Sequence, residues 1–139
     1  MNREELEKIS KNLIETFNFA GRESIEIYKK GLKIEIKEDN SPVSNGDLKV
    51  NEILTNRIKE LTPNIPIVSE ETVDIKKKNT AKIFWLIDPI DGTKEYIAGL
   101  DEYTLNAALV VNTVPVLGLV GVPKKERLFY SYAPGESYL

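Results

Sequence analysis

The stretch Phe84–Tyr96, FWLIDPIDGTKEY, constrains the fold of this chain more than any other part of it. It begins within an apolar run, residues 83–87, which predicts a buried strand. Pro89 has no backbone N–H and a fixed φ, so we expect the strand to stop there. Two carboxylates that stand three residues apart, Asp88 and Asp91, are therefore placed at the end of a buried strand.

Two carboxylates held close together repel each other, and both stay ionised only when a cation lies between them. The chain has no cysteine and no histidine, so oxygen ligands favour Mg²⁺ or Mn²⁺ over zinc. Gly92 permits a tight turn, and residues 93–98 predict a short helix whose first N–H groups could receive a phosphate oxygen. A purely structural interpretation is also open, in which Asp88 closes the turn and Asp91 caps the helix.

Length and charge narrow the class of protein. The 139 residues are 41% hydrophobic and carry a formal net charge of −3, which is typical of one globular domain. A mildly acidic chain lacks the basic surface expected for a nucleic-acid polymer or an anionic membrane. No stretch is apolar enough to predict a membrane span, and the absence of cysteine fits a cytoplasmic location.

Hydrophobic periodicity predicts two helices, at residues 3–30 and 48–61, with Asn45 or Asp47 capping the second. Besides the central run, five segments have the composition of strands: 32–36, 65–68, 103–112, 116–122 and 128–132. The last three are joined by short turns, which predicts an antiparallel meander. The expected fold is therefore α+β, with two helices packed on an antiparallel sheet.

The string DPIDGT resembles the metal-binding motif of the inositol monophosphatase-like superfamily of Mg²⁺-dependent, lithium-sensitive phosphatases. The continuation Lys94–Tyr96 is more similar to the 3′(2′),5′-bisphosphate nucleotidase branch than to the inositol monophosphatases. The resemblance covers nearly all of the chain but only the first half of the family's layered αβαβα fold. It implies that residues 1–139 form the N-terminal α+β domain and that the C-terminal α/β domain, with its further aspartate ligand and most of the substrate pocket, is absent.

The resemblance also assigns roles to individual residues. It implies that Mg²⁺ is held by four groups: the carboxylates of Glu70, Asp88 and Asp91, and the backbone carbonyl of Ile90. It implies that Thr93 orients or deprotonates the attacking water while Asp47 accepts the proton of Thr93. On the residues alone, Glu70 and Glu71 are equally consistent with a solvated strand end, and Thr93 with a locally capped helix residue.

Phosphate or substrate binding is implied for the N–H groups of Gly92 and Thr93 and for Lys37 and Asp39. The last two lie in a polar, turn-rich stretch, residues 37–47, that resembles the flexible loop closing over the family's active site. An ordinary solvated hairpin connection accounts for the same composition.

The expected function is Mg²⁺-dependent hydrolysis of 3′-phosphoadenosine 5′-phosphate to AMP and phosphate by two-metal activation of water, as part of sulfur metabolism. A phosphatase of inositol or sugar monophosphates is one alternative, and a non-catalytic association domain is another. The expected partner is a small phosphorylated metabolite, and exposure of an apolar surface without the second half favours homo-oligomers. We expect the chain to be weakly active or inactive alone.

Overall fold

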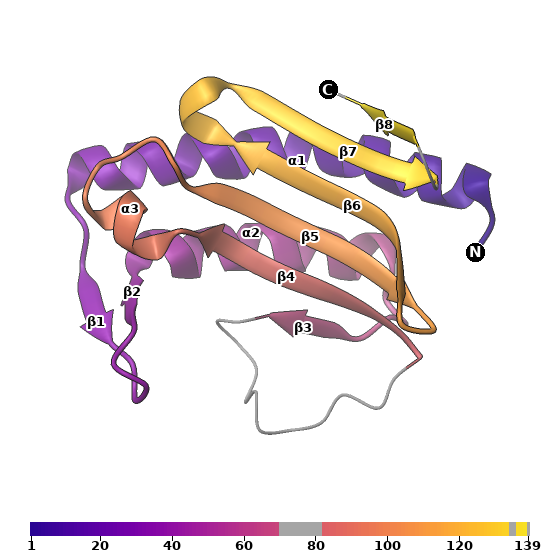
Figure 1. The fold of residues 1–139 in the computed structure, drawn as a ribbon, viewed down its shortest axis with the longest axis horizontal. Coiled ribbons are helices and arrows are strands. Elements are labelled where there is room, and N and C mark those ends of the chain that lie inside the picture. Colours follow the sequence, from indigo (N-terminus) through magenta and orange to yellow (C-terminus); the bar gives the residue numbers. More distant parts are fainter. Residues whose placement is uncertain (70–81, 134–135, 139) are drawn as a thin grey trace.

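The computed structural model describes residues 1–69, 82–133 and 136–138. A six-stranded sheet in the order β3-β4-β5-β6-β7-β8 forms its centre, and a separate two-stranded ribbon pairs β1 with β2 (Figure 1). The elements in chain order are α1 (Arg3–Lys30), β1 (Ile34–Ile36), β2 (Pro42–Ser44), α2 (Asn45–Leu61), β3 (Ile67–Ser69), β4 (Ile83–Asp91), α3 (Thr93–Ile97), β5 (Thr104–Val111), β6 (Val114–Val122), the 3₁₀ turn η1 (Pro123–Lys125), β7 (Arg127–Ala133) and β8 (Glu136–Tyr138). The predicted α+β fold is confirmed.

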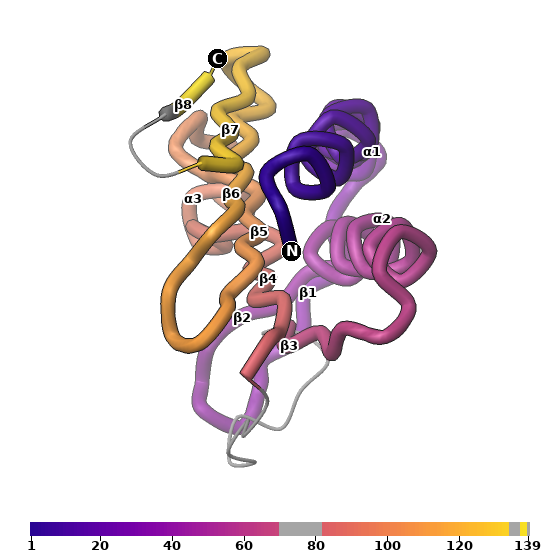
Figure 2. The backbone as a smooth tube through the Cα atoms, turned by 90° about the vertical axis from the view of Figure 1, so that its right-hand side faces the viewer, coloured from indigo at the N-terminus to yellow at the C-terminus, as the bar shows by residue number. Residues whose placement is uncertain are grey.

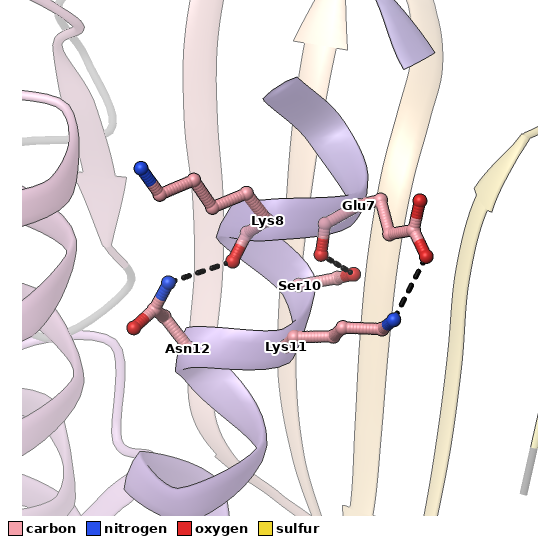
Figure 3. A network of polar contacts seen from close by, with 5 residues as sticks. All are labelled: Glu7, Lys8, Ser10, Lys11 and Asn12. Carbon is pink, nitrogen blue, oxygen red and sulfur yellow. Dashed lines mark hydrogen bonds and ion pairs between the residues drawn. The ribbon is translucent and has the colours of Figure 1, made fainter. Parts of the chain in front are cut away.

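Helix α1 has the boundaries that its periodicity predicts. Asn2 caps its start, where the side chain accepts a hydrogen bond from Glu5 N at 2.8 Å. On the exposed side of its first turns, Lys11 Nζ lies 2.8 Å from a carboxylate oxygen of Glu7 (Figure 3). This contact lowers the pKa of Glu7 and raises that of Lys11, each because of hydrogen bonding to the other. The pair is solvent-exposed, so it adds little to stability.

Helices α1 and α2 lie side by side on one face of the sheet (Figure 2). α1 packs against β6 and β7, and α2 packs against β4. The largest fully buried side chain between these layers is Trp85 of β4. Its indole Nε1 donates a 3.0 Å hydrogen bond to Thr62 Oγ1 at the end of α2, so the polar edge of the ring is satisfied inside the core.

The opposite face of the sheet carries apolar side chains that stay exposed. On β4 the buried Trp85 and Ile87 alternate with Leu86, which is 50% exposed. Phe129 of β7 is 41% exposed and Val120 of β6, its partner in register, is 37% exposed. Within the described residues, this face therefore leaves several large apolar side chains exposed to solvent.

Strand β4 differs from the prediction because it does not end at Pro89. It continues to Asp91 and pairs with β5 on both sides of the proline, as Asp88 with Asn106 and Asp91 with Thr104. The register shifts between these two pairs, so the missing N–H of Pro89 falls in an irregular step of the ladder. The strand therefore passes through the proline with a shift of register, whereas we expected it to stop there.

Three further features were not predicted. Among the strands of the described residues, the pair β3–β4 is parallel, whereas the other pairs are antiparallel. A short last strand, β8, pairs with β7. The stretch 37–47 is only partly a loop, because Pro42–Ser44 forms β2 against β1 and helix α2 already begins at Asn45.

Candidate functional site

The hydroxyl of Thr93 and the carboxylate of Asp47 meet at the junction of β4, α3 and α2. Thr93 Oγ1 donates to Asp47 Oδ1 at 2.8 Å and lies 3.3 Å from the carbonyl oxygen of Ile90. Asp47 is 0% exposed, whereas Thr93 is partly exposed. The two residues stand 46 positions apart, so the fold itself creates this contact.

Asp47 is held from its other side by Ser44, the actual cap of α2. Ser44 N donates to Asp47 Oδ2 at 2.9 Å, and Asp47 N donates back to Ser44 Oγ at 3.2 Å. This reciprocal capping box corrects our expectation that Asn45 or Asp47 would be the cap. Since Oδ2 is occupied by Ser44, Oδ1 is the oxygen directed at Thr93. The spacing Ser-x-x-Asp at 44–47 is a signal that could have identified the cap.

Asp88 and Asp91 lie on either side of the irregular step in β4. Asp88 is half-buried and follows Leu86 on the open face of the sheet by strand alternation, while Asp91 is exposed at the strand end. The carbonyl of Ile90 accepts the longer contact from Thr93 and so lies beside the Thr93–Asp47 pair. The strand thus supplies two carboxylates and one carbonyl within four residues.

Glu70 lies outside the described residues. The residue before it in the sequence, Ser69, pairs in parallel register with Ile87, the residue before Asp88. Ser69 itself is buried, and its hydroxyl reaches the Asn51 side chain of α2. The last described residue of β3 is therefore aligned with the position next to Asp88.

The donor chemistry of this edge fits a hard divalent cation. Asp88, Asp91 and the Ile90 carbonyl present only oxygen atoms, and the whole chain has no thiol or imidazole. Within the described ranges, no group of three or more acidic residues gathers closely enough to hold a metal. The two aspartates and the carbonyl alone therefore do not make up a full set of ligands for such an ion.

Gly92 is required by the backbone between Asp91 and Thr93. Its φ of 92° and ψ of 44° are left-handed, and an added Cβ would come within 2.9 Å of the Glu102 carbonyl oxygen. This glycine starts α3, whose first turn closes with the hydrogen bond from Tyr96 N to Gly92 O at 2.9 Å. Thr93 is consequently fixed at the first position of a short, tightly anchored helix.

Lys37 and Asp39 belong to the tip of the β1–β2 ribbon. The carboxylate of Asp39 accepts hydrogen bonds from the N–H and the hydroxyl of Ser41, and these bonds lower the pKa of Asp39. Lys37 N donates to the Ser41 carbonyl at 2.8 Å and so closes the turn. The structure brings Asp47 and Thr93 into contact, whereas Asp39 makes its hydrogen bonds within its own hairpin.

A buried tyrosine cluster behind Thr93 escaped our sequence analysis. Tyr96 Oη donates to the Ser24 carbonyl of α1 at 2.6 Å, and Tyr103 Oη lies 2.9 Å from Ser24 Oγ. The two rings meet edge to face with centroids 4.8 Å apart. Burial raises the pKa of both tyrosines, most strongly that of Tyr96. These residues are 72 and 79 positions from Ser24, so no local pattern signals the contact.

In the described residues, none of the helices is both long and apolar enough to cross a membrane.

Comparisons with a family model, with curated sequences and with solved structures all identify the same family. The model of the inositol monophosphatase family matches residues 4–138. The 3′(2′),5′-bisphosphate nucleotidase CysQ of Haemophilus influenzae is 35% identical over 114 residues, which are 81% of this chain and 42% of that protein. The chain thus spans about half the length of the curated relatives it matches.

Solved structures agree with this result. The crystal structure of CysQ from Bacteroides thetaiotaomicron matches with a TM-score of 0.73 and 36% identity, over 91% of this chain and 46% of that one. An IMPase/NADP phosphatase solved with Mg²⁺ and phosphate matches with a TM-score of 0.82 at 19% identity, over 96% and 51% of the two chains, which supports the fold. The resemblance first drawn from DPIDGT is confirmed: the chain belongs to the inositol monophosphatase family.

Proposed function

We propose that this chain carries the water-activating half of a Mg²⁺-dependent phosphatase that removes the 3′-phosphate of 3′-phosphoadenosine 5′-phosphate. The observation that carries the proposal is the 2.8 Å hydrogen bond between Thr93 and the buried Asp47, located beside the carboxylates of DPIDGT. The choice of substrate is supported by the similarity to proteins named 3′(2′),5′-bisphosphate nucleotidase.

The proposed ligands of Mg²⁺ are Glu70, Asp88, Asp91 and the carbonyl of Ile90. Two described carboxylates and a carbonyl fit the preference of this ion for oxygen donors, and Mn²⁺ prefers the same donors. When bound, such ions lower the pKa of water and neutralise charge on the phosphate and the leaving oxygen.

The Thr93–Asp47 pair has a defined role in this proposal. Because the hydroxyl proton of Thr93 is directed at Asp47 Oδ1, the lone pairs of Thr93 Oγ1 remain as the acceptor for a proton of water. The water oxygen forms a bond to phosphorus and the bond from phosphorus to the 3′-oxygen breaks. The water proton moves to Thr93 Oγ1 as the hydroxyl proton of Thr93 passes to Asp47 Oδ1, and the departing 3′-oxygen takes up a proton from solvent water. Burial of Asp47 and its bonds from Ser44 keep the carboxylate fixed during this step.

Other groups are proposed to bind the substrate. The N–H groups of Gly92 and Thr93 would hold phosphate oxygens, and Lys37 and Asp39 would approach from the β1–β2 ribbon. We further propose that the enzyme is lithium-sensitive, acts in the cytoplasm and serves sulfur metabolism. These points are supported by the family resemblance and, for the location, by the absence of cysteine.

The test is phosphate release from 3′-phosphoadenosine 5′-phosphate by the 139-residue chain, with and without Mg²⁺, beside an Asp88→Asn variant. Release that requires Mg²⁺ and disappears in the variant would support the proposal. Inositol 1-phosphate in parallel tests the alternative substrate class, and preferential release from it would overturn the nucleotidase assignment. Absence of release from both substrates at every Mg²⁺ concentration would overturn catalysis by this chain and favour the association domain.

A further inference from the structure

Tyr96 anchors α3 in the interior of the molecule. Its side chain is 1% exposed, and its hydroxyl donates to the Ser24 carbonyl of α1 at 2.6 Å. The ring also contacts Tyr103 edge to face and lies 6.0 Å, between centroids, from the ring of Tyr28. The position of this phenol is therefore fixed by α1, through Ser24 and Tyr28, and by Tyr103, which precedes β5.

Tyr96 leaves no room for a side chain at Gly46, which lies in the first turn of α2. A Cβ on Gly46 would lie 2.6 Å from Cε2 and 2.8 Å from Cζ of Tyr96, and would overlap its hydroxyl oxygen as well. The backbone of Gly46 is helical, so its conformation does not demand glycine. The phenol of Tyr96 occupies the space that a side chain at position 46 would need.

This contact lies directly behind the Thr93–Asp47 hydrogen bond. Asp47 follows Gly46 in the first turn of α2, and Thr93 stands one turn before Tyr96 in α3. The proximity of the Asp47 charge also adds to the raised pKa of Tyr96, after burial and the neighbouring Tyr103. The first turn of α2 and helix α3 are thus in close contact at Gly46 and Tyr96. They are also joined by the hydrogen bond between Asp47 and Thr93.

We propose that Gly46 and Tyr96 are a matched pair of positioning residues that sets the separation of Asp47 and Thr93. Neither touches substrate. Their contact fixes how closely α3 approaches α2, and this approach decides whether Thr93 Oγ1 directs its proton at Asp47. The consequence for catalysis rests on the proposed function, whereas the interlocking of the two side chains does not.

The test is a double-mutant cycle of Gly46→Ala and Tyr96→Phe in the 139-residue chain. We expect Gly46→Ala alone to lower the melting temperature by about 5 °C or more, because an inserted methyl group overpacks the core. It should also change the Thr93 side-chain rotamer, measured from three-bond NMR couplings, and lower kcat by about tenfold or more at similar KM. Tyr96→Phe removes the overlapping hydroxyl and the tether to Ser24, which lets the ring shift, but it keeps Cε2 and Cζ beside the added methyl group. The double variant should therefore recover part of each loss.

Two matched controls sharpen the cycle. In Gly118→Ala the added methyl group would lie 4.0 Å from the Ala107 carbonyl oxygen, an ordinary contact distance, so this variant should leave the Thr93 rotamer unchanged. Tyr103→Phe also removes a buried hydroxyl bonded to Ser24, but it should not rescue Gly46→Ala. A wild-type rotamer and melting temperature in Gly46→Ala, or equal rescue by Tyr103→Phe, would overturn the proposal. If the wild-type chain releases no phosphate, catalysis by this chain alone is overturned, while the rotamer and melting temperature still decide this inference.

Discussion

The two faces of the six-stranded sheet carry similar apolar side chains but bury them to different extents. On the face covered by α1 and α2, Trp85 and Leu109 are 0% exposed. On the opposite face, Leu86, adjacent to Trp85 in the sequence, is 50% exposed and Phe129 is 41% exposed. Composition is therefore a poor guide to which apolar residues hold this domain together, and the predicted acidic metal ligand Asp88 lies on the face that contributes less to the core.

The largest expected difference between the faces is in stability. Trp85→Ala should lower the free energy of unfolding by about 3–5 kcal/mol, because it removes a fully buried ring and leaves a cavity. Leu86→Ala, one residue away and half exposed, should cost less than about 1 kcal/mol. Urea denaturation of both variants measures the contrast, and equal losses would show that the open face is packed as tightly as the covered one.

A polar contact on the covered face should have the next largest effect. Thr62→Val leaves the buried Nε1 of Trp85 without its acceptor, so we expect a loss of about 1–3 kcal/mol in unfolding free energy. Thr16→Val, on the partly exposed surface of α1, is the matched control and should stay within about 0.5 kcal/mol. A neutral Thr62→Val would mean that the indole finds another partner.

The next prediction concerns Asp88, on the open face of the sheet, where we expect a change of charge to affect Mg²⁺ binding. Asp88→Asn removes one negative charge from the proposed ligand set without changing its shape, so Mg²⁺ affinity should fall by about tenfold or more. Isothermal titration calorimetry measures this loss against Asp101→Asn, which alters an exposed carboxylate in a turn. Unchanged affinity in Asp88→Asn would remove this residue from the proposed ligands.

The last contrast concerns association more than stability. Replacing Leu86 and Phe129 together by serine should lower the unfolding free energy by about 1 kcal/mol, since the two side chains are only 50% and 41% exposed in the folded chain. The same double variant should reduce self-association in sedimentation velocity, because the apolar surface that favours it is interrupted. Wild-type protein that is already monomeric at high concentration would contradict this expectation.

Helix α1 and the edge that carries Asp88–Thr93 could be predicted because local signals in the sequence decide them. The periodicity of residues 3–30 gave the whole of α1 because its buried positions follow one helical face. The motif Asp88–Thr93 identified the edge where Thr93 now meets Asp47, and family resemblance supplied their pairing before the fold was known. The roles of the predicted metal and phosphate ligands remain predictions.

Local rules failed where distant partners outweighed them. Pro89 predicts the end of a strand, but pairing with β5 on both sides carries β4 past it to Asp91. Nothing near Tyr96 in the sequence signals its bond to Ser24, since the two residues are 72 positions apart and meet only in the folded chain. The need for glycine at position 46 likewise comes from its contact with the ring of Tyr96, which is 50 residues later in the sequence.

The long separations around Thr93 have a consequence for the order of folding. The contacts that define this corner close loops of 46, 72 and 79 residues, whereas α1 forms from contacts a few residues apart. Closing long loops costs entropy before any packing offsets it, so such contacts form late in folding. We therefore expect Thr93 and Asp47 to come together only after the helices have docked on the sheet. A partly folded chain in which only the helices have formed would then lack the pair on which the proposed chemistry depends.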